Sequence, residues 1–189
     1  PKNPYSFGQI LLPGGLIMPS LQQRQLAMAF NKSGQELAKV LKGSDGDDIV
    51  QQALALGAEK KAASRVAITL EHLLPFADAI DWITWGGEMG EQALLDAGFL
   101  PRVLGRPGQP LSQAEDTQAA AAALKNAGVD LILFAGGDGT ARDILRAVGT
   151  SVPVLGIPAG VKIHSGVYAI SPRAAGELTR RLVEGGLVR

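Results

Sequence analysis

The stretch DLILFAGGDGTARDIL, Asp130 to Leu145, runs from apolar residues through a glycine-rich turn into an amphipathic segment. Its apolar start, residues 130–135, predicts a strand that is buried on both faces, as in a parallel sheet covered by helices. The glycines predict a turn, and we expect the next helix to run from Ala141 to Val148. The feature that needs an explanation is Asp138, a carboxylate between glycines where the strand gives way to the helix.

The same alternation continues along the chain and predicts the fold class. Further strands are expected at residues 80–85, 101–105, 152–157 and 165–171, and helices at 43–58, 59–74, 88–96, 112–128 and 172–186. Strands that alternate with helices predict an α/β fold with a doubly wound, mostly parallel sheet flanked by helices. Residues 1–40 give no comparable pattern, although 21–41 suggest one helix that breaks near 31–34.

The composition excludes several classes of protein. Apolar residues make up 46% of the 189 residues and charged residues 19%, which is typical of a folded globular chain. A formal net charge of zero, without a basic stripe, argues against a nucleic-acid partner. The chain has no cysteine, and its two histidines, His72 and His164, lack the spacing of a zinc motif. No apolar run approaches the roughly 20 residues of a membrane span, so we expect no membrane association and a cytoplasmic location.

Asp138 is expected at the carboxyl end of a parallel strand, where α/β sheets collect their ligands. Glycines let a backbone approach a ligand closely, and the N-terminus of the next helix offers free N–H groups to a phosphate. Because a carboxylate repels phosphate, Asp138 makes sense if it takes a proton from an attacking hydroxyl or binds Mg²⁺, as phosphoryl transfer requires. An alternative stays open, in which Asp138 caps the helix and the glycines form a tight loop. Neither G-x-x-x-x-G-K-[ST] nor G-x-G-x-x-G is present.

Several segments, in order, resemble the NAD kinase family, and in particular its branch of ATP-NAD kinases and acetoin-catabolism accessory proteins. They are LKGSDGDD (41–48), AEDTQAAAAAL (114–124), FAGGDGTARDIL (134–145) and GIPAGVKIHSGVYAISP (156–172). The resemblance covers roughly residues 41–185 and implies a Rossmann-like N-terminal kinase domain. It implies ATP or polyphosphate as phosphoryl donor, Mg²⁺ as cofactor, NAD as acceptor and NADP as product. The partners expected are small-molecule nucleotides, and the chain is expected to form a homo-oligomer.

The resemblance also implies roles for individual residues. Asp138 is the base that accepts the proton of the 2′-hydroxyl on the adenosine ribose of NAD, which then attacks the γ-phosphate. Lys162 and His164, in the second glycine turn, are placed to meet phosphate or ribose oxygens, although a hydrogen-bonded, partly buried His164 stays an alternative. No residue is singled out as a metal ligand. The residues expected to bind nucleotide are Gly136, Gly137, Gly139, Thr140, Gly160, Lys162 and His164.

Two departures from the family shape the expected domain organisation. NAD kinases begin with a strand and an Asn-Pro-x-Ala-Gly turn that residues 1–40 do not show, and they continue into a β-rich C-terminal domain absent from these 189 residues. We therefore expect a poorly assigned segment at 1–40 and a nucleotide-binding kinase domain at 41–189. By themselves, these residues are expected to bind nucleotide weakly and to turn over little or not at all.

Two other functions stay open. The turn Pro158-Ala159-Gly160 departs from the Asn-x-Gly form common in NAD kinases. This departure favours a related kinase of the diacylglycerol kinase superfamily that acts on a lipid or another small alcohol. The missing segments favour a non-catalytic, nucleotide-binding accessory protein.

Overall fold

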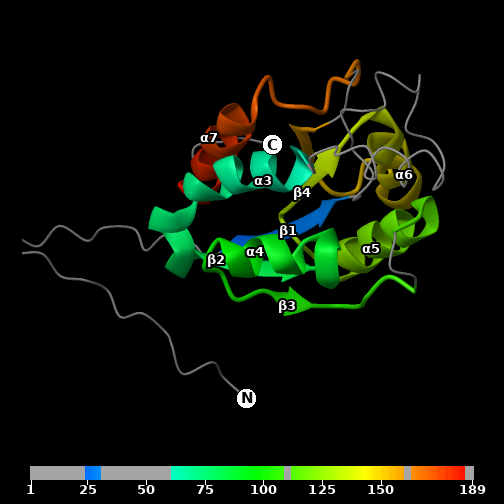
Figure 1. The fold of residues 1–189 in the computed structure, drawn as a ribbon, viewed down its shortest axis with the longest axis horizontal. Coiled ribbons are helices and arrows are strands. Elements are labelled where there is room, and N and C mark those ends of the chain that lie inside the picture. The colour runs from blue at the N-terminus through cyan, green and yellow to red at the C-terminus, as the bar shows by residue number, and fades with distance from the viewer. Residues whose placement is uncertain (1–23, 31–60, 109–111, 160–162, 186–189) are drawn as a thin grey trace, which may run out of the picture.

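The structure is a computed structural model, and it describes residues 24–30, 61–108, 112–159 and 163–185 (Figure 1). Within these ranges, five strands form one parallel sheet in the order β3-β2-β1-β4-β5. The strands are β1 Arg24–Phe30, β2 Ile80–Thr84, β3 Arg102–Val103, β4 Leu131–Gly136 and β5 Val154–Pro158. The α-helices are α3 Lys61–Glu71, α4 Glu91–Asp96, α5 Ala114–Asn126, α6 Asp138–Val148 and α7 Pro172–Val183, with 3-10 helices η1 Leu74–Ala79 and η2 Gly87–Met89. This arrangement confirms the predicted α/β class, while the helix expected at 43–58 lies outside the described residues.

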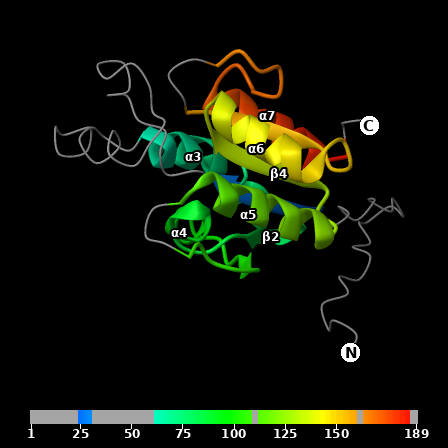
Figure 2. The same cartoon turned by 90° about the vertical axis from the view of Figure 1, so that its right-hand side faces the viewer.

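Helices cover both faces of the sheet, and the core therefore has two layers. Along β4, Leu133 packs in one layer with residues of α3 and α7, whereas Ile132 and Phe134 pack in the other with residues of α5 and α6. α3 and α7 lie side by side in both Figure 1 and Figure 2, and so do α5 and α6. All six residues of β4 are buried, as expected for a strand covered on both faces.

The first strand is the clearest difference from the sequence-based prediction. A broken helix is predicted over residues 21–41, but residues 24–30 form the central strand of the sheet, so the prediction is wrong there. Most residues of the segment RQLAMAF favour a helix, yet residues 26–28 are fully buried between β2 and β4. Asp130 anchors this pairing, because its backbone N–H donates to the carbonyl of Gln25 at 2.8 Å and its carboxylate accepts the N–H of Gln25 at 3.0 Å. Burial between neighbouring strands thus overrides local propensity.

Two further details differ from the prediction. The helix expected from residue 112 begins at Ala114, with Gln113 as its N-cap, and the N–H of Gln113 donates to the carboxylate of Asp116 at 2.9 Å. Residues 165–171, expected as a strand, contact β5 through an isolated bridge between Tyr168 and Gly156. This segment consequently runs as a loop over the edge of the sheet before α7 begins.

The topology gathers the carboxyl ends of all five strands at one edge of the sheet. β1 lies between β2 and β4, so the strand order reverses direction beside β1, and such a switch point is where open α/β sheets bind ligands. At this edge the last residues of β4 and β5, Gly136 and Pro158, lie opposite each other. None of the helices within the described ranges is long and apolar enough to cross a membrane.

Candidate functional site

The turn after β4 is shorter than predicted, because α6 begins at Asp138 rather than at Ala141. Gly137 is the N-cap in an extended conformation (φ −116°, ψ −171°), and its carbonyl accepts the N–H of Ala141 at 3.2 Å. The sequence misplaces this start because glycine disfavours a helix, whereas Gly139 lies in the first turn. Asp138 is therefore the first helical residue, where a carboxylate interacts favourably with the helix dipole.

Gly136 and Thr140 bring the end of β4 and the first turn of α6 into close contact. A Cβ at Gly136 would lie 2.4 Å from Oγ1 and 2.8 Å from Cβ of Thr140. Glycine is therefore required at this position by packing. A Cβ at Gly139 would meet nothing within 4 Å, so the exposed side of the first turn stays open.

The carboxylate of Asp138 is half-buried and faces the loop between β5 and α7. Its Oδ2 accepts the backbone N–H of His164 at 3.0 Å, and its Oδ1 accepts the backbone N–H of Ser165 at 3.2 Å. Two amides thus orient the carboxylate. An ionised carboxylate has about four acceptor positions, so it can still accept a further hydrogen bond.

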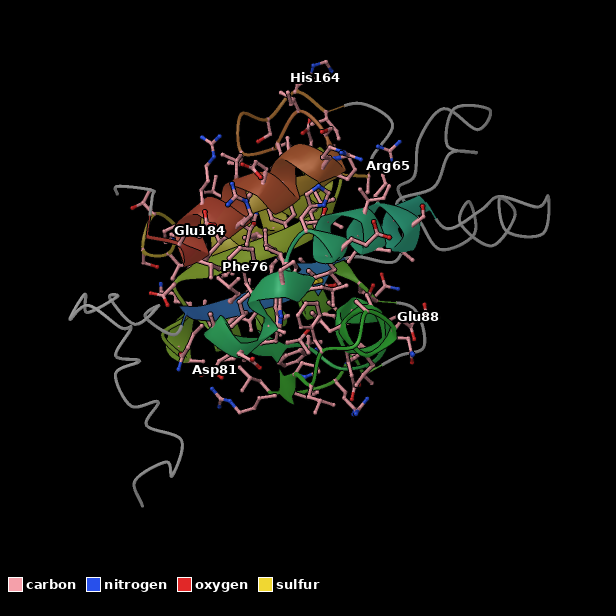
Figure 3. All side chains as sticks on the ribbon, turned by 90° about the vertical axis from the view of Figure 1, so that its left-hand side faces the viewer. Arg65, Phe76, Asp81, Glu88, His164 and Glu184 are labelled. Atoms are coloured by element: carbon pink, nitrogen blue, oxygen red, sulfur yellow. The ribbon has the colours of Figure 1, made fainter. Side chains whose placement is uncertain are left out.

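The structure brings most of the predicted site residues to this one edge. Asp138, Gly136, Gly137, Gly139 and Thr140 form the junction of β4 and α6. His164 reaches Asp138 through its main chain, while its imidazole is exposed and points outward (Figure 3). Gly160 and Lys162 lie outside the described residues. The roles assigned to all these residues stay predictions.

Tyr168 is part of the same edge, although the sequence did not single it out. Its hydroxyl donates to the carbonyl of Gly137 at 2.6 Å. Its ring covers Gly156, where a Cβ would lie 2.3 Å from the ring, and it meets Phe134 edge-on with 5.3 Å between ring centroids. Burial raises the pKa of Tyr168 above its ordinary value, and the charge of Asp138 raises it further, so the hydroxyl stays a donor. Tyr168 therefore ties the loop to the glycine turn.

Arg65, on α3, is a second residue that sequence reasoning missed. Its Nη1 donates to the carbonyl of Pro158, the last residue of β5, at 3.0 Å. From the sequence alone, Arg65 is one polar position of an ordinary amphipathic helix. Its place at the edge of the sheet follows from the packing of α3, which no local pattern reports.

The loops after β2 and β3 are joined at the same edge. The N–H of Gly86 donates to the carbonyl of Gly105 at 2.7 Å. The carboxylate of Glu91 accepts the N–H of Gly87 at 2.7 Å and two bonds from the guanidinium of Arg106, at 2.6 and 2.8 Å. The bond from Gly87, and then that from Arg106, lower the pKa of Glu91. This network holds the loops beside the switch point.

The donor set at the edge fits a cation that arrives with a nucleotide. Within the described ranges no three His, Cys, Asp or Glu side chains are grouped so that they could hold a metal ion. Mg²⁺ usually keeps several waters and takes only one or two protein carboxylates beside substrate phosphates. The single carboxylate of Asp138 meets that requirement.

Comparison with known proteins agrees with this arrangement. Residues 28–187 match the family described as the ATP-NAD kinase N-terminal domain, whereas no curated protein matches the chain. The match begins inside β1 and extends beyond α7, so it spans the parallel sheet and the turn around Asp138. β1 lies within residues 1–40, where the sequence suggested part of a broken helix instead of a strand. The chain belongs to the ATP-NAD kinase N-terminal domain family, a kinase family with a Rossmann-like nucleotide-binding fold.

Proposed function

We propose that the protein is an NAD kinase, which transfers the γ-phosphate of ATP, or a phosphate of polyphosphate, to the 2′-hydroxyl on the adenosine ribose of NAD. Membership of the family supports a kinase. The observation that carries the proposal is the carboxylate of Asp138, half-buried at the carboxyl edge of the sheet and oriented by the amides of His164 and Ser165. It is a single acceptor group beside bare glycine backbone, which suits an alcohol approaching a phosphate.

In this reaction Asp138 accepts the proton of the ribose hydroxyl. The hydroxyl oxygen forms a bond to the γ-phosphorus, the bond from that phosphorus to the β,γ-bridging oxygen breaks, and ADP leaves with the electron pair. A positioned general base contributes typically about 10²- to 10⁴-fold to a rate. Asp138 also has to keep its orientation as charge develops on the reacting oxygens, and the amides of His164 and Ser165 hold it in that orientation.

The phosphates are expected to bind beside the first turn of α6. The first N–H groups of a helix have no partner within the helix, and its N-terminus carries a partial positive charge. Gly139 leaves the exposed side of that turn free of side-chain atoms. Mg²⁺ bound to the phosphates would neutralise part of their charge, while the carboxylate of Asp138 stays free to accept the proton of the ribose hydroxyl.

One observation favours a second candidate, a non-catalytic nucleotide-binding protein. The bonds from His164 and Ser165 give Asp138 a structural task, since they fasten the loop before α7 to the start of α6. A carboxylate occupied in this way can be retained for folding alone. The two candidates differ in what the loss of the negative charge does to turnover.

The deciding experiment measures NADP formed by the purified full-length protein from Mg-ATP and NAD. Asp138→Asn keeps the size of the side chain and removes its charge, so we expect the rate to fall about 10²- to 10⁴-fold. Asp143→Asn is the matched control, because Asp143 lies on the same helix and pairs with Arg146 and Gln118. We expect that control to keep its rate within about twofold, because the carboxylate of Asp143 contacts Gln118 and Arg146 and the change is close to neutral in size.

An unchanged rate in Asp138→Asn would remove Asp138 from the mechanism. No NADP from the wild-type protein, with either ATP or polyphosphate as donor, would favour the non-catalytic candidate. Phosphorylation of a lipid alcohol in place of NAD would favour the related lipid kinases. The proposed homo-oligomer is tested separately, by sedimentation of the same protein.

A further inference from the structure

Arg65 is a cation that the fold carries to the carboxyl edge of the sheet. Figure 3 shows it projecting from α3, and its Nη1 lies 3.0 Å from the carbonyl oxygen of Pro158. Pro158 lies opposite Gly136 in the register of β4 and β5, and Gly136 is two residues before Asp138. The guanidinium is therefore at the same edge as the proposed base, although 73 positions separate the two residues in sequence (138 − 65 = 73).

The environment of Arg65 differs from that of the other arginines whose side chains the structure describes. Those with a carboxylate partner are Arg106, Arg146, Arg180 and Arg181. Three others, Arg102, Arg142 and Arg173, are exposed and form no salt bridge with another described residue. Arg65 is half-buried, and within the described ranges its partner is a main-chain carbonyl rather than an acid. A guanidinium carries five N–H donors, so this single bond leaves most of its donors and its whole charge available.

The two faces of the sheet each bring a positively charged group to this edge. α3 packs in the core layer that also contains α7, and α6 packs in the opposite layer with α5. Arg65 consequently approaches the edge from one face, and the N-terminus of α6 approaches it from the other. A planar guanidinium forms paired hydrogen bonds with phosphate oxygens. Its bond to Pro158 holds it in place beforehand, which reduces the ordering that binding costs.

We propose that Arg65 binds a phosphate group of the nucleotide at this edge, together with the N-terminus of α6. This inference rests on the proposed function for the identity of the ligand, a nucleoside triphosphate. A purely structural Arg65 would only fasten α3 to the end of β5. Its loss would then lower stability without changing nucleotide affinity.

The test is an equilibrium titration of the full-length protein with Mg-ATP, and in parallel with inorganic tripolyphosphate. We expect Arg65→Ala to weaken both affinities by about 10- to 100-fold, the size usual for a hydrogen bond to a charged group. Arg65→Lys keeps the charge and loses the paired geometry, so its affinity for each ligand should lie between that of the wild-type protein and that of Arg65→Ala. Arg181→Ala is the matched control, since Arg181 pairs with Glu177 near the end of α7, away from the edge.

Unchanged affinity in Arg65→Ala would overturn the proposal, and so would an equal loss in Arg181→Ala. Thermal unfolding of each variant checks that it is folded. Should Arg65→Ala not fold, wild-type affinity in a folded Arg65→Lys protein would overturn the proposal instead. Binding is measured without turnover, so a protein that binds ATP through Arg65 but makes no NADP refutes only the proposed function. If the wild-type protein makes NADP and Arg65→Ala keeps the wild-type affinity for ATP, only the role of Arg65 is refuted.

Discussion

Replacing Tyr168 by phenylalanine removes one hydroxyl and keeps the ring that covers Gly156. The lost contact is the 2.6 Å bond to the carbonyl of Gly137. That carbonyl also accepts the N–H of Ala141 at 3.2 Å, so the change does not leave it without a partner. We therefore expect Tyr168→Phe to cost about 1 kcal/mol of unfolding free energy near neutral pH. For a chain of this length that corresponds to a fall of about 2–4 °C in Tm.

The same variant has a predictable dependence on pH. Burial, and then the charge of Asp138, raise the pKa of Tyr168 in the folded protein, whereas an unfolded tyrosine ionises near pH 10. The stability that this hydroxyl contributes is therefore complete below about pH 10 and is lost as the pH rises above it. At pH 10.5 the wild type loses up to about 0.8 kcal/mol relative to the phenylalanine variant, and less where solvent screens the half-buried ring.

Urea unfolding of both proteins at pH 8 and pH 10.5 measures the difference. We expect the wild-type protein to be more stable by about 1 kcal/mol at pH 8 and by only a few tenths at pH 10.5. Equal midpoints at pH 8 would refute the bond to Gly137. A difference that stays constant between the two pH values would refute the argument from burial and from Asp138.

Three further substitutions test contacts around the edge and in the helical layer. Gly156→Ala would place a Cβ 2.3 Å from the ring of Tyr168 and force it to move, so in a double-mutant cycle the cost of removing the hydroxyl should shrink nearly to zero; full additivity would contradict the contact. Glu91→Gln should lower the urea midpoint at pH 7, because the bonds from Gly87 and then Arg106 lower the pKa of Glu91. The difference in midpoint from the wild-type protein should persist above about pH 4.3 and vanish as the pH falls below that value. In Gly176→Ala the new Cβ would lie 2.8 Å from the carbonyl oxygen of Thr69. We therefore expect the free energy of unfolding to fall by about 1–3 kcal/mol, despite the better helix propensity of alanine. A raised Tm would show that α3 and α7 are not packed this closely.

Local features of the fold could be predicted because their causes lie within a few residues. The apolar run predicted a buried strand at 130–135, and a fully buried strand forms at 131–136. Gly128 adopts φ +75° just after α5, and Ser171 caps α7 with Pro172 in its first turn, as the preferences of these residues suggest. The glycine turn with its carboxylate was visible for the same reason, and it marked the edge where the described residues of the predicted site lie.

Other features depend on partners that are distant in the chain. The residues of β1 favour a helix, and this segment is a strand only because it pairs with β2 on one side and β4 on the other. The hydroxyl of Tyr168 reaches a carbonyl 31 residues away, and Arg65 reaches one 93 residues away. No periodicity in the sequence reports such contacts, because they depend on how helices pack across the sheet.

The sequence by itself determined the α/β class, the junction of β4 with α6 and the presence of a carboxylate among its glycines. These follow from strand burial, backbone freedom and helix capping, which act between near neighbours. The tertiary structure decided where that carboxylate points, which amides hold it and which cation shares its edge. Such matters depend on the order of the strands and on the close packing of the two helical layers, since only a packed fold brings residues from separate parts of the chain within hydrogen-bonding distance.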